Sequence, residues 1–216
     1  MNTQRRPLIL APRFTPLWGI LIGAVGGGVY WIGAQLWPTS IAVILSMLAT
    51  SLVCARIDDF PAAGDSAATP APVLLGMVFA VLVMYNALMA LSAASLPFVL
   101  PANLALGLIM IAGHAASRAL LVSVVASPVP RASPQQQVTP ASHADLGIAL
   151  AIGFAPAVLI GIPGLMGLVA AIAARFAVIA YLRSTRPSFA GKELDMTRQV
   201  TELCFYLGAV AGWAYA

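Results

Sequence analysis

The sequence predicts an all-α fold, a polytopic transmembrane helical bundle of about seven helices. Of its 216 residues, 61% are hydrophobic and only 8% are charged, whereas soluble domains carry about 25% charged residues. The mean hydropathy is +0.94. The apolar runs have the length of a membrane-spanning helix, about 20 residues, and not that of the alternating strands of an outer-membrane barrel, about 10 residues. We therefore expect a single integral membrane domain over residues 1–216, embedded in a lipid bilayer.

Seven apolar runs define the expected spans. The second, the fifth and the seventh are short, and boundaries read from sequence shift by a few residues, so counts of six or eight stay open. The runs are Pro16 to Trp37, Thr39 to Ala55, Pro72 to Ser92, Asn103 to Val125, Leu146 to Ile162, Leu165 to Leu182 and Val200 to Ala216.

The first span is rich in glycine. In "WGILIGAVGGGVYWIG", Gly19, Gly23 and Gly27 follow one another at intervals of four residues. Small residues at this spacing allow the backbones of two membrane helices to approach closely. We expect this face to pack tightly against another helix.

The second span ends in an acidic segment, "CARIDDFPAAGD", which contains Asp58, Asp59 and Asp65. These are three of the seven carboxylates of the chain. Carboxylate oxygens are the ligands that Mg²⁺ takes from proteins. Two interpretations stay open, a solvated loop and a metal site at the mouth of the bundle.

Span four, which follows the uncharged third span, contains two ionisable residues. His114 and Arg118 are four residues apart and share one helix face, and ionisable residues at membrane depth indicate function by default. Arg118 could instead extend its side chain to the membrane surface. For Arg175, in span six beyond the "PG" turn that ends span five, the sequence favours the structural interpretation, snorkelling or an internal ion pair.

The last span has a polar approach, "FAGKELDMTRQVTELCF". Lys192, Asp195, Gln199 and Glu202 fall at i, i+3, i+7 and i+10, on one helix face. Glu202 already lies inside the apolar run, where a carboxylate needs a partner or a metal. Arg131, in the Pro- and Gln-rich loop before span five, is a further candidate contact for an anion.

The charged connectors predict the orientation. The N-terminal segment and the loops after spans two, four and six carry charge, whereas the loops after spans one, three and five carry none. Lys and Arg collect in cytoplasmic loops, so we expect all charged segments, and the active face, in the cytoplasm. The net charge of +4 is gathered in these flanks, which argues against a nucleic-acid partner.

Carboxylates and basic groups at one face suit phosphoryl-type transfer, because Mg²⁺ and arginines neutralise the charge that develops on phosphate oxygens. Four segments, in order, resemble the cobalamin synthase family, adenosylcobinamide-GDP ribazoletransferase. "FTPLWGILIGAVGGGVYW" resembles its opening helix, "RIDDFPAAGDS" stands at its acidic motif, "AGHAASRALLVSVVASPVPRA" resembles its arginine helix, and "FAGKELDMTRQVTELCFYL" resembles its closing motif.

Individual residues carry the resemblance. Asp58 and Asp65 match the outer aspartates of the acidic motif H-L-D-G-x-A-D-x-x-D-G, while Ala62 stands at the middle one; alternatively, Asp65 belongs to the later D-S-R-x-G motif of the family. Arg118 and Arg131 match family arginines. In the closing motif Glu202 matches, whereas Lys192 stands where the family has an aspartate.

The resemblance implies a multi-pass protein of the bacterial cytoplasmic (inner) membrane. Its reaction transfers the adenosylcobinamide phosphate from adenosylcobinamide-GDP to α-ribazole or its 5′-phosphate and releases GMP. Asp58, Asp59 and Asp65 would hold Mg²⁺, and Glu202 would orient a ligand or accept the hydroxyl proton. Arg118, Arg131, His114 and Lys192 would contact substrate.

Two alternatives stay open, and so does a homo-oligomer. One is a catalytically impaired member of the family that acts as a binding or assembly subunit. The other is a small-solute transporter whose path is lined by buried ionisable groups.

Overall fold

The computed structural model describes residues 12–57, 71–93, 102–126, 142–185 and 191–214. These residues form a short 3-10 turn and seven α-helices, with no strand among them. Six of the helices are long and apolar enough to cross a membrane, so the predicted all-α transmembrane bundle is confirmed. The helices are α1 (Thr15–Leu36), α2 (Thr39–Ile57), α3 (Ala71–Ser92), α4 (Ala102–Val125), α5 (His143–Ile160), α6 (Ile162–Thr185) and α7 (Gly191–Trp213).

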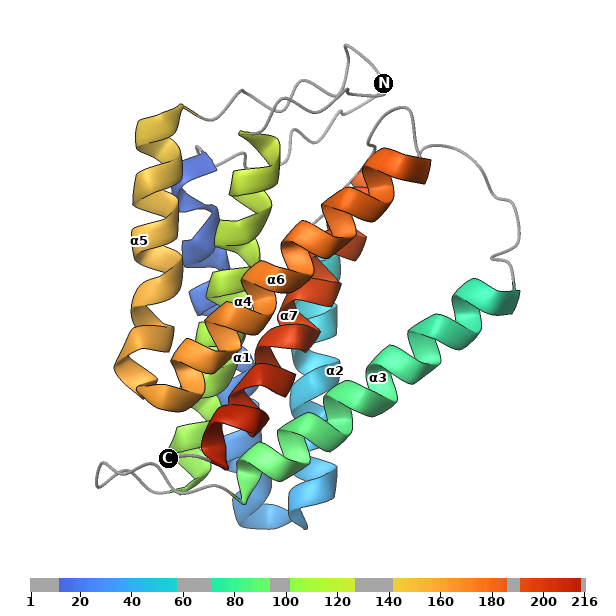
Figure 1. Cartoon of the computed structure of the whole chain (residues 1–216). Coiled ribbons are helices and arrows are strands. Elements are labelled where there is room, and N and C mark those ends of the chain that lie inside the picture. Colours follow the sequence, from blue (N-terminus) through green and yellow to red (C-terminus); the bar gives the residue numbers. More distant parts are fainter. Residues whose placement is uncertain (1–11, 58–70, 94–101, 127–141, 186–190, 215–216) are drawn as a thin grey trace, which may run out of the picture.

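Successive helices run in opposite directions through the bundle (Figure 1). As a result α2, α4 and α6 end, and α3, α5 and α7 begin, at the same end, which is uppermost in Figure 1. We call it the charged end, because Arg13, Arg56, Asp145 and Arg183 lie in helical turns there. The arrangement agrees with the expected common face of the charged segments, whose cytoplasmic location stays a prediction.

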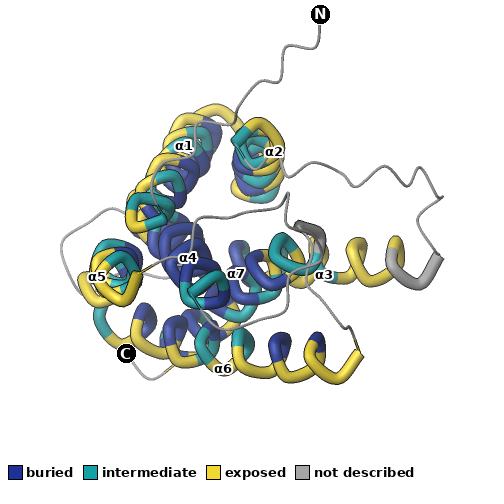
Figure 2. The backbone as a smooth tube through the Cα atoms, turned by 90° about the horizontal axis from the view of Figure 1, so that it is seen from above, coloured by how far each residue is buried: buried dark blue, intermediate teal, exposed yellow. Residues whose placement is uncertain are grey.

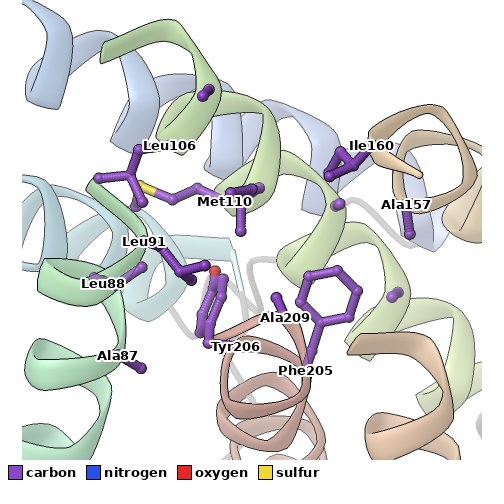
Figure 3. Packing of buried hydrophobic residues seen from close by; sticks show 14 of the residues in the cluster. Ala87, Leu88, Leu91, Leu106, Met110, Ala157, Ile160, Phe205, Tyr206 and Ala209 are labelled. Atoms are coloured by element: carbon purple, nitrogen blue, oxygen red, sulfur yellow. The ribbon is translucent and has the colours of Figure 1, made fainter. Parts of the chain in front are cut away.

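Helix α4 occupies the centre of the bundle, as Figure 2 shows. In its apolar window 78% of the residues are buried, against 17 to 39% in the other membrane-length helices. The core packs α3, α4, α5 and α7 together (Figure 3). Its largest members include Leu88, Leu91, Leu106, Phe205 and Tyr206. A buried residue on α4 is therefore packed against side chains from several other helices.

The backbones of helices α1 and α4 lie in direct contact. A Cβ atom added to Gly27 would lie 2.7 Å from the Cα of Gly107, and one added to Gly23 would collide with the backbone of Ile111. Only glycine leaves room for such an approach. The close packing predicted from the glycine spacing of the first span is confirmed.

Two predicted boundaries are wrong at α5. The helix begins at His143 and not at Leu146, because Ser142 and Asp145 form a capping box in which each side chain accepts the other residue's backbone N–H. It ends at Ile160, and the turn to α6 is Gly161, whose φ of 83° favours glycine. Pro163 and Gly164, which the sequence indicated as the turn, lie in the first turn of α6.

Candidate functional site

Four ionisable side chains are buried together where α4 and α7 meet, between the middle of the bundle and the charged end. We call His114 and Arg118 of α4 with Arg198 and Glu202 of α7 the buried cluster. The exposed fraction of each residue is 6% or less. Charged groups in such surroundings are stable only when they are paired. The partners of each therefore decide what the cluster can do.

Glu202 lies at the centre of the cluster. Its Oε2 is 3.1 Å from His114 Nδ1 and accepts a hydrogen bond from Arg198 Nη1 at 3.4 Å, while the Tyr206 hydroxyl donates to Oε1 at 3.5 Å. Of the two alternatives that the sequence left for Glu202, a partner or a metal, the structure shows partners, His114, Arg198 and Tyr206.

Arg198 extends the cluster toward the charged end. Its Nε and Nη2 both donate to Asp195 Oδ1, at 3.1 and 2.7 Å. The other oxygen of Asp195 accepts a hydrogen bond from Gln199 at 2.8 Å. Asp195, Gln199 and Glu202 thus share one face of α7, as their spacing predicted, and Arg198 ties two of the carboxylates together.

A cysteine of α2 joins the two arginines. Cys54 Sγ lies 3.6 Å from Arg118 Nη2 and 3.9 Å from Arg198 Nη1. Arg118 is fully buried, so it does not extend to the membrane surface, the alternative that the sequence left open. Cys54 is close to the end of α2 at Ile57, and the acidic segment follows it directly along the chain.

The cluster borders a cavity of about 1010 Å³ between α2, α3, α4 and α7, at the upper end of the range for ligand sites, about 300 to 1,000 Å³. Its charged lining comes from α7, with His114 from α4 beside it. The polar lining is Thr50, Ser51, Cys54, His114, Asp195, Arg198, Gln199 and Glu202; the apolar lining includes Ile44, Met47, Leu48, Met77, Val81, Leu82, Met84 and Tyr85.

The structure brings three of the predicted site residues together, His114, Arg118 and Glu202. The other predicted site residues, Asp58, Asp59, Asp65 and Arg131, lie outside the described residues. Of Lys192 the backbone, in the first turn of α7, is described.

Arg175 stands apart from the cluster. Its Nε and Nη2 donate to the hydroxyl and the carbonyl of Ser123, at 3.1 and 3.2 Å, and its guanidinium lies over the Phe176 ring. Arg175 therefore ties α6 to α4. The structural role that the sequence favoured for Arg175 takes the form of hydrogen bonds to Ser123.

Sequence reasoning missed two members of the site, Arg198 and Cys54. A signal for Arg198 was present, because it lies three residues after Asp195 and four before Glu202, the spacings at which helix side chains meet. Nothing local marks Cys54, since its partners are 64 and 144 residues away along the chain.

A metal site cannot be assembled from the described residues alone. Among them, no group of three or more His, Cys, Asp or Glu side chains could hold a metal ion. The expected Mg²⁺ site thus depends on Asp58, Asp59 and Asp65, which follow α2 beyond Ile57.

Comparison with known proteins does not identify the chain. No family model matches it, and neither the curated proteins nor the solved structures contain a significant match. The resemblance to the cobalamin synthase family therefore rests on the four sequence segments.

Proposed function

We propose that the chain is a membrane-embedded transferase that moves the adenosylcobinamide phosphate from adenosylcobinamide-GDP to α-ribazole or its 5′-phosphate and releases GMP. The observation that carries this proposal is the convergence of α2, α4 and α7. It places Arg198, His114 and Glu202 in the lining of a large cavity. Arg118 contacts Cys54, a lining residue of α2, the helix from which the acidic segment continues.

In this reaction a hydroxyl oxygen of the acceptor attacks the phosphorus of the donor, and the bond from phosphorus to the GMP oxygen breaks. Little covalent chemistry is asked of the protein, which must position the reactants and offset negative charge. Arg198 supplies positive charge in the lining at one end of the cavity, and Arg118, which contacts the lining residue Cys54, adds a second positive charge nearby. Glu202, held between Arg198 and His114, is placed to orient a hydroxyl group or to accept its proton.

Magnesium would be bound by Asp58, Asp59 and Asp65, with Lys192 and Arg131 as further contacts to phosphate. When bound, the ion would neutralise charge on the diphosphate. A bacterial inner membrane with the charged end in the cytoplasm would give the nucleotide donor direct access to this site.

A second candidate is a family member that binds the same ligands without turnover. The observation that favours it is the pair of motif departures, Ala62 in the acidic motif and Lys192 in the closing motif, which put a methyl group and a cation where the family has aspartates. Both candidate functions require that the donor binds, but only the transferase releases GMP.

Protection of Cys54 from alkylation tests whether the donor binds at this end of the cavity. The chain has two cysteines, and only Cys54 lines the cavity. In a Cys204→Ser variant reconstituted in lipid, we expect adenosylcobinamide-GDP with Mg²⁺ to slow labelling of Cys54 by a small neutral maleimide several-fold. The effect should be saturable, because a bound diphosphate would cover the space beside both arginines.

The matched control is the Cys54→Ser variant, in which Cys204 is the reporter and the donor should not change the labelling rate. An unchanged rate at Cys54 up to millimolar donor would contradict binding at this site, for the catalytic and the non-catalytic candidate alike.

A further inference from the structure

The apolar part of the cavity opens sideways toward the bilayer. Ile44 and Leu48 of α2 and Met77, Val81 and Leu82 of α3 line it, yet each is between 51 and 57% exposed. Side chains that line a cavity and also face outward mark its rim. Because α2 and α3 are membrane-length helices, this rim borders lipid.

Helix α3 shows why the opening exists. Its described side chains from Leu74 to Phe79 are all exposed, and those it buries, Ala87, Leu88 and Leu91, lie near its C-terminal end. Figures 1 and 2 both show α3 joined to the bundle at that end and leaning away from α2 toward the charged end. The cavity between the two helices is lined by Met77, Val81 and Leu82 of α3, in the part of the helix that precedes its buried residues.

The length of the cavity matches half a bilayer. Along α2 its lining extends from Ile44 to Ala55, which at 1.5 Å per residue is about 16 Å. The hydrocarbon core of a bilayer is about 30 Å thick, so one leaflet contributes about 15 Å. The polar lining lies at the charged end, and the apolar lining extends from there toward the middle of the bundle. A lipid of that leaflet has the same orientation, with its head group at the charged end and its acyl chains toward the middle.

The polar lining carries charges of both signs. Arg198 is the cation, and Asp195, with a side chain that is 34% exposed, is the accessible carboxylate beside it. The amide of Gln199, an exposed residue, adds a neutral donor and acceptor. Such a rim complements a head group that bears both a phosphate and an ammonium group better than one that is only anionic.

We propose that the cavity binds one zwitterionic glycerophospholipid from the leaflet at the charged end. Its acyl chains enter between α2 and α3 along Leu48 and Val81, and its head group lies at Asp195, Arg198 and Gln199. This proposal goes beyond the transfer reaction and does not depend on it. Because Arg198 also belongs to the proposed donor site, a bound donor would displace the lipid head group. Leu48 and Val81 are more than half exposed, so larger side chains there can fill the entrance without disturbing the core.

The test measures lipid retained by the full chain after purification in a mild detergent. We expect the wild type to keep one phospholipid per chain more than Val81→Trp and Leu48→Trp, by phosphorus assay and by mass spectrometry of the intact complex. The matched control is Val78→Trp, also on α3 and 49% exposed but outside the cavity, which should retain as much phospholipid as the wild type.

A photoactivatable phosphatidylethanolamine with a diazirine on its acyl chain gives a second measurement in the same proteins. It should label peptides of α2 and α3 that line the cavity, and unlabelled phosphatidylethanolamine should compete better than phosphatidylglycerol. Equal phospholipid in all four proteins, or retention of detergent or fatty acid without phosphorus, would overturn the lipid site. Equal competition by the two phospholipids would overturn the assignment of the head group.

Discussion

Replacing Glu202 by alanine is expected to lower the free energy of unfolding by about 3 to 5 kcal/mol, because removing one partner of a buried ion pair leaves the other charge uncompensated. Arg198 and His114 both contact Oε2 of this residue, and each is almost fully buried. Unfolding of the purified variant in mixed micelles, followed by far-UV circular dichroism against denaturing detergent, gives the change.

Asp195→Ala is the matched control, since it removes the other carboxylate that contacts Arg198. The Asp195 side chain is 34% exposed, and partly solvated pairs are worth roughly 0 to 1 kcal/mol. We expect a much smaller loss of stability than for Glu202→Ala. Similar small losses in both variants would mean that Glu202 is not a charged partner in the folded protein.

Arg118→Ala is expected to reduce the efficiency with which the chain uses adenosylcobinamide-GDP by about tenfold to a hundredfold. A hydrogen bond to a charged group contributes about 1.5 to 3 kcal/mol, and each 1.4 kcal/mol corresponds to a factor of ten in rate. Arg118 contacts Cys54, which lines the cavity. Turnover is measured against donor concentration after equal folding has been confirmed.

Arg175→Ala serves as the comparison, because Arg175 binds Ser123 and neither residue lines the cavity. This variant should keep an efficiency close to that of the wild type. Arg118→Lys, which keeps the positive charge, should recover part of the loss. Equal losses for Arg118→Ala and Arg175→Ala would assign Arg118 a structural role and remove it from the phosphate contacts.

Much of the fold could be predicted from the sequence, because in a membrane the number and direction of helices follow from the lengths of the apolar runs and the charges between them. The predicted start of the third span, Pro72, is one residue from the observed start of α3 at Ala71. The apolar run that begins at Val200 is shorter than its helix, because α7 begins at Gly191. This confirms that the polar segment before Val200 is the start of the last helix, as the spacing of Asp195, Gln199 and Glu202 predicted.

The candidate site could be predicted only in part. The spacing of His114 with Arg118 and of Asp195 with Glu202 is local information, and the structure places these residues at one cavity. The contact of Cys54 with the two arginines depends on how α2 is placed beside α4 and α7, which hydrophobic patterning does not specify. The tilt of α3 away from α2 could not be predicted either, because apolar residues are distributed evenly around this helix.

Release of GMP is the measurement that tests the central claim most directly. The purified chain, reconstituted in lipid vesicles, is mixed with adenosylcobinamide-GDP, α-ribazole and Mg²⁺, and GMP and the joined corrinoid product are quantified together by chromatography. We expect equal amounts of both products, none without α-ribazole, and none after chelation of Mg²⁺ or in Asp58→Asn. No GMP from a folded wild-type protein that still protects Cys54 would contradict catalysis and leave a binding subunit as the function.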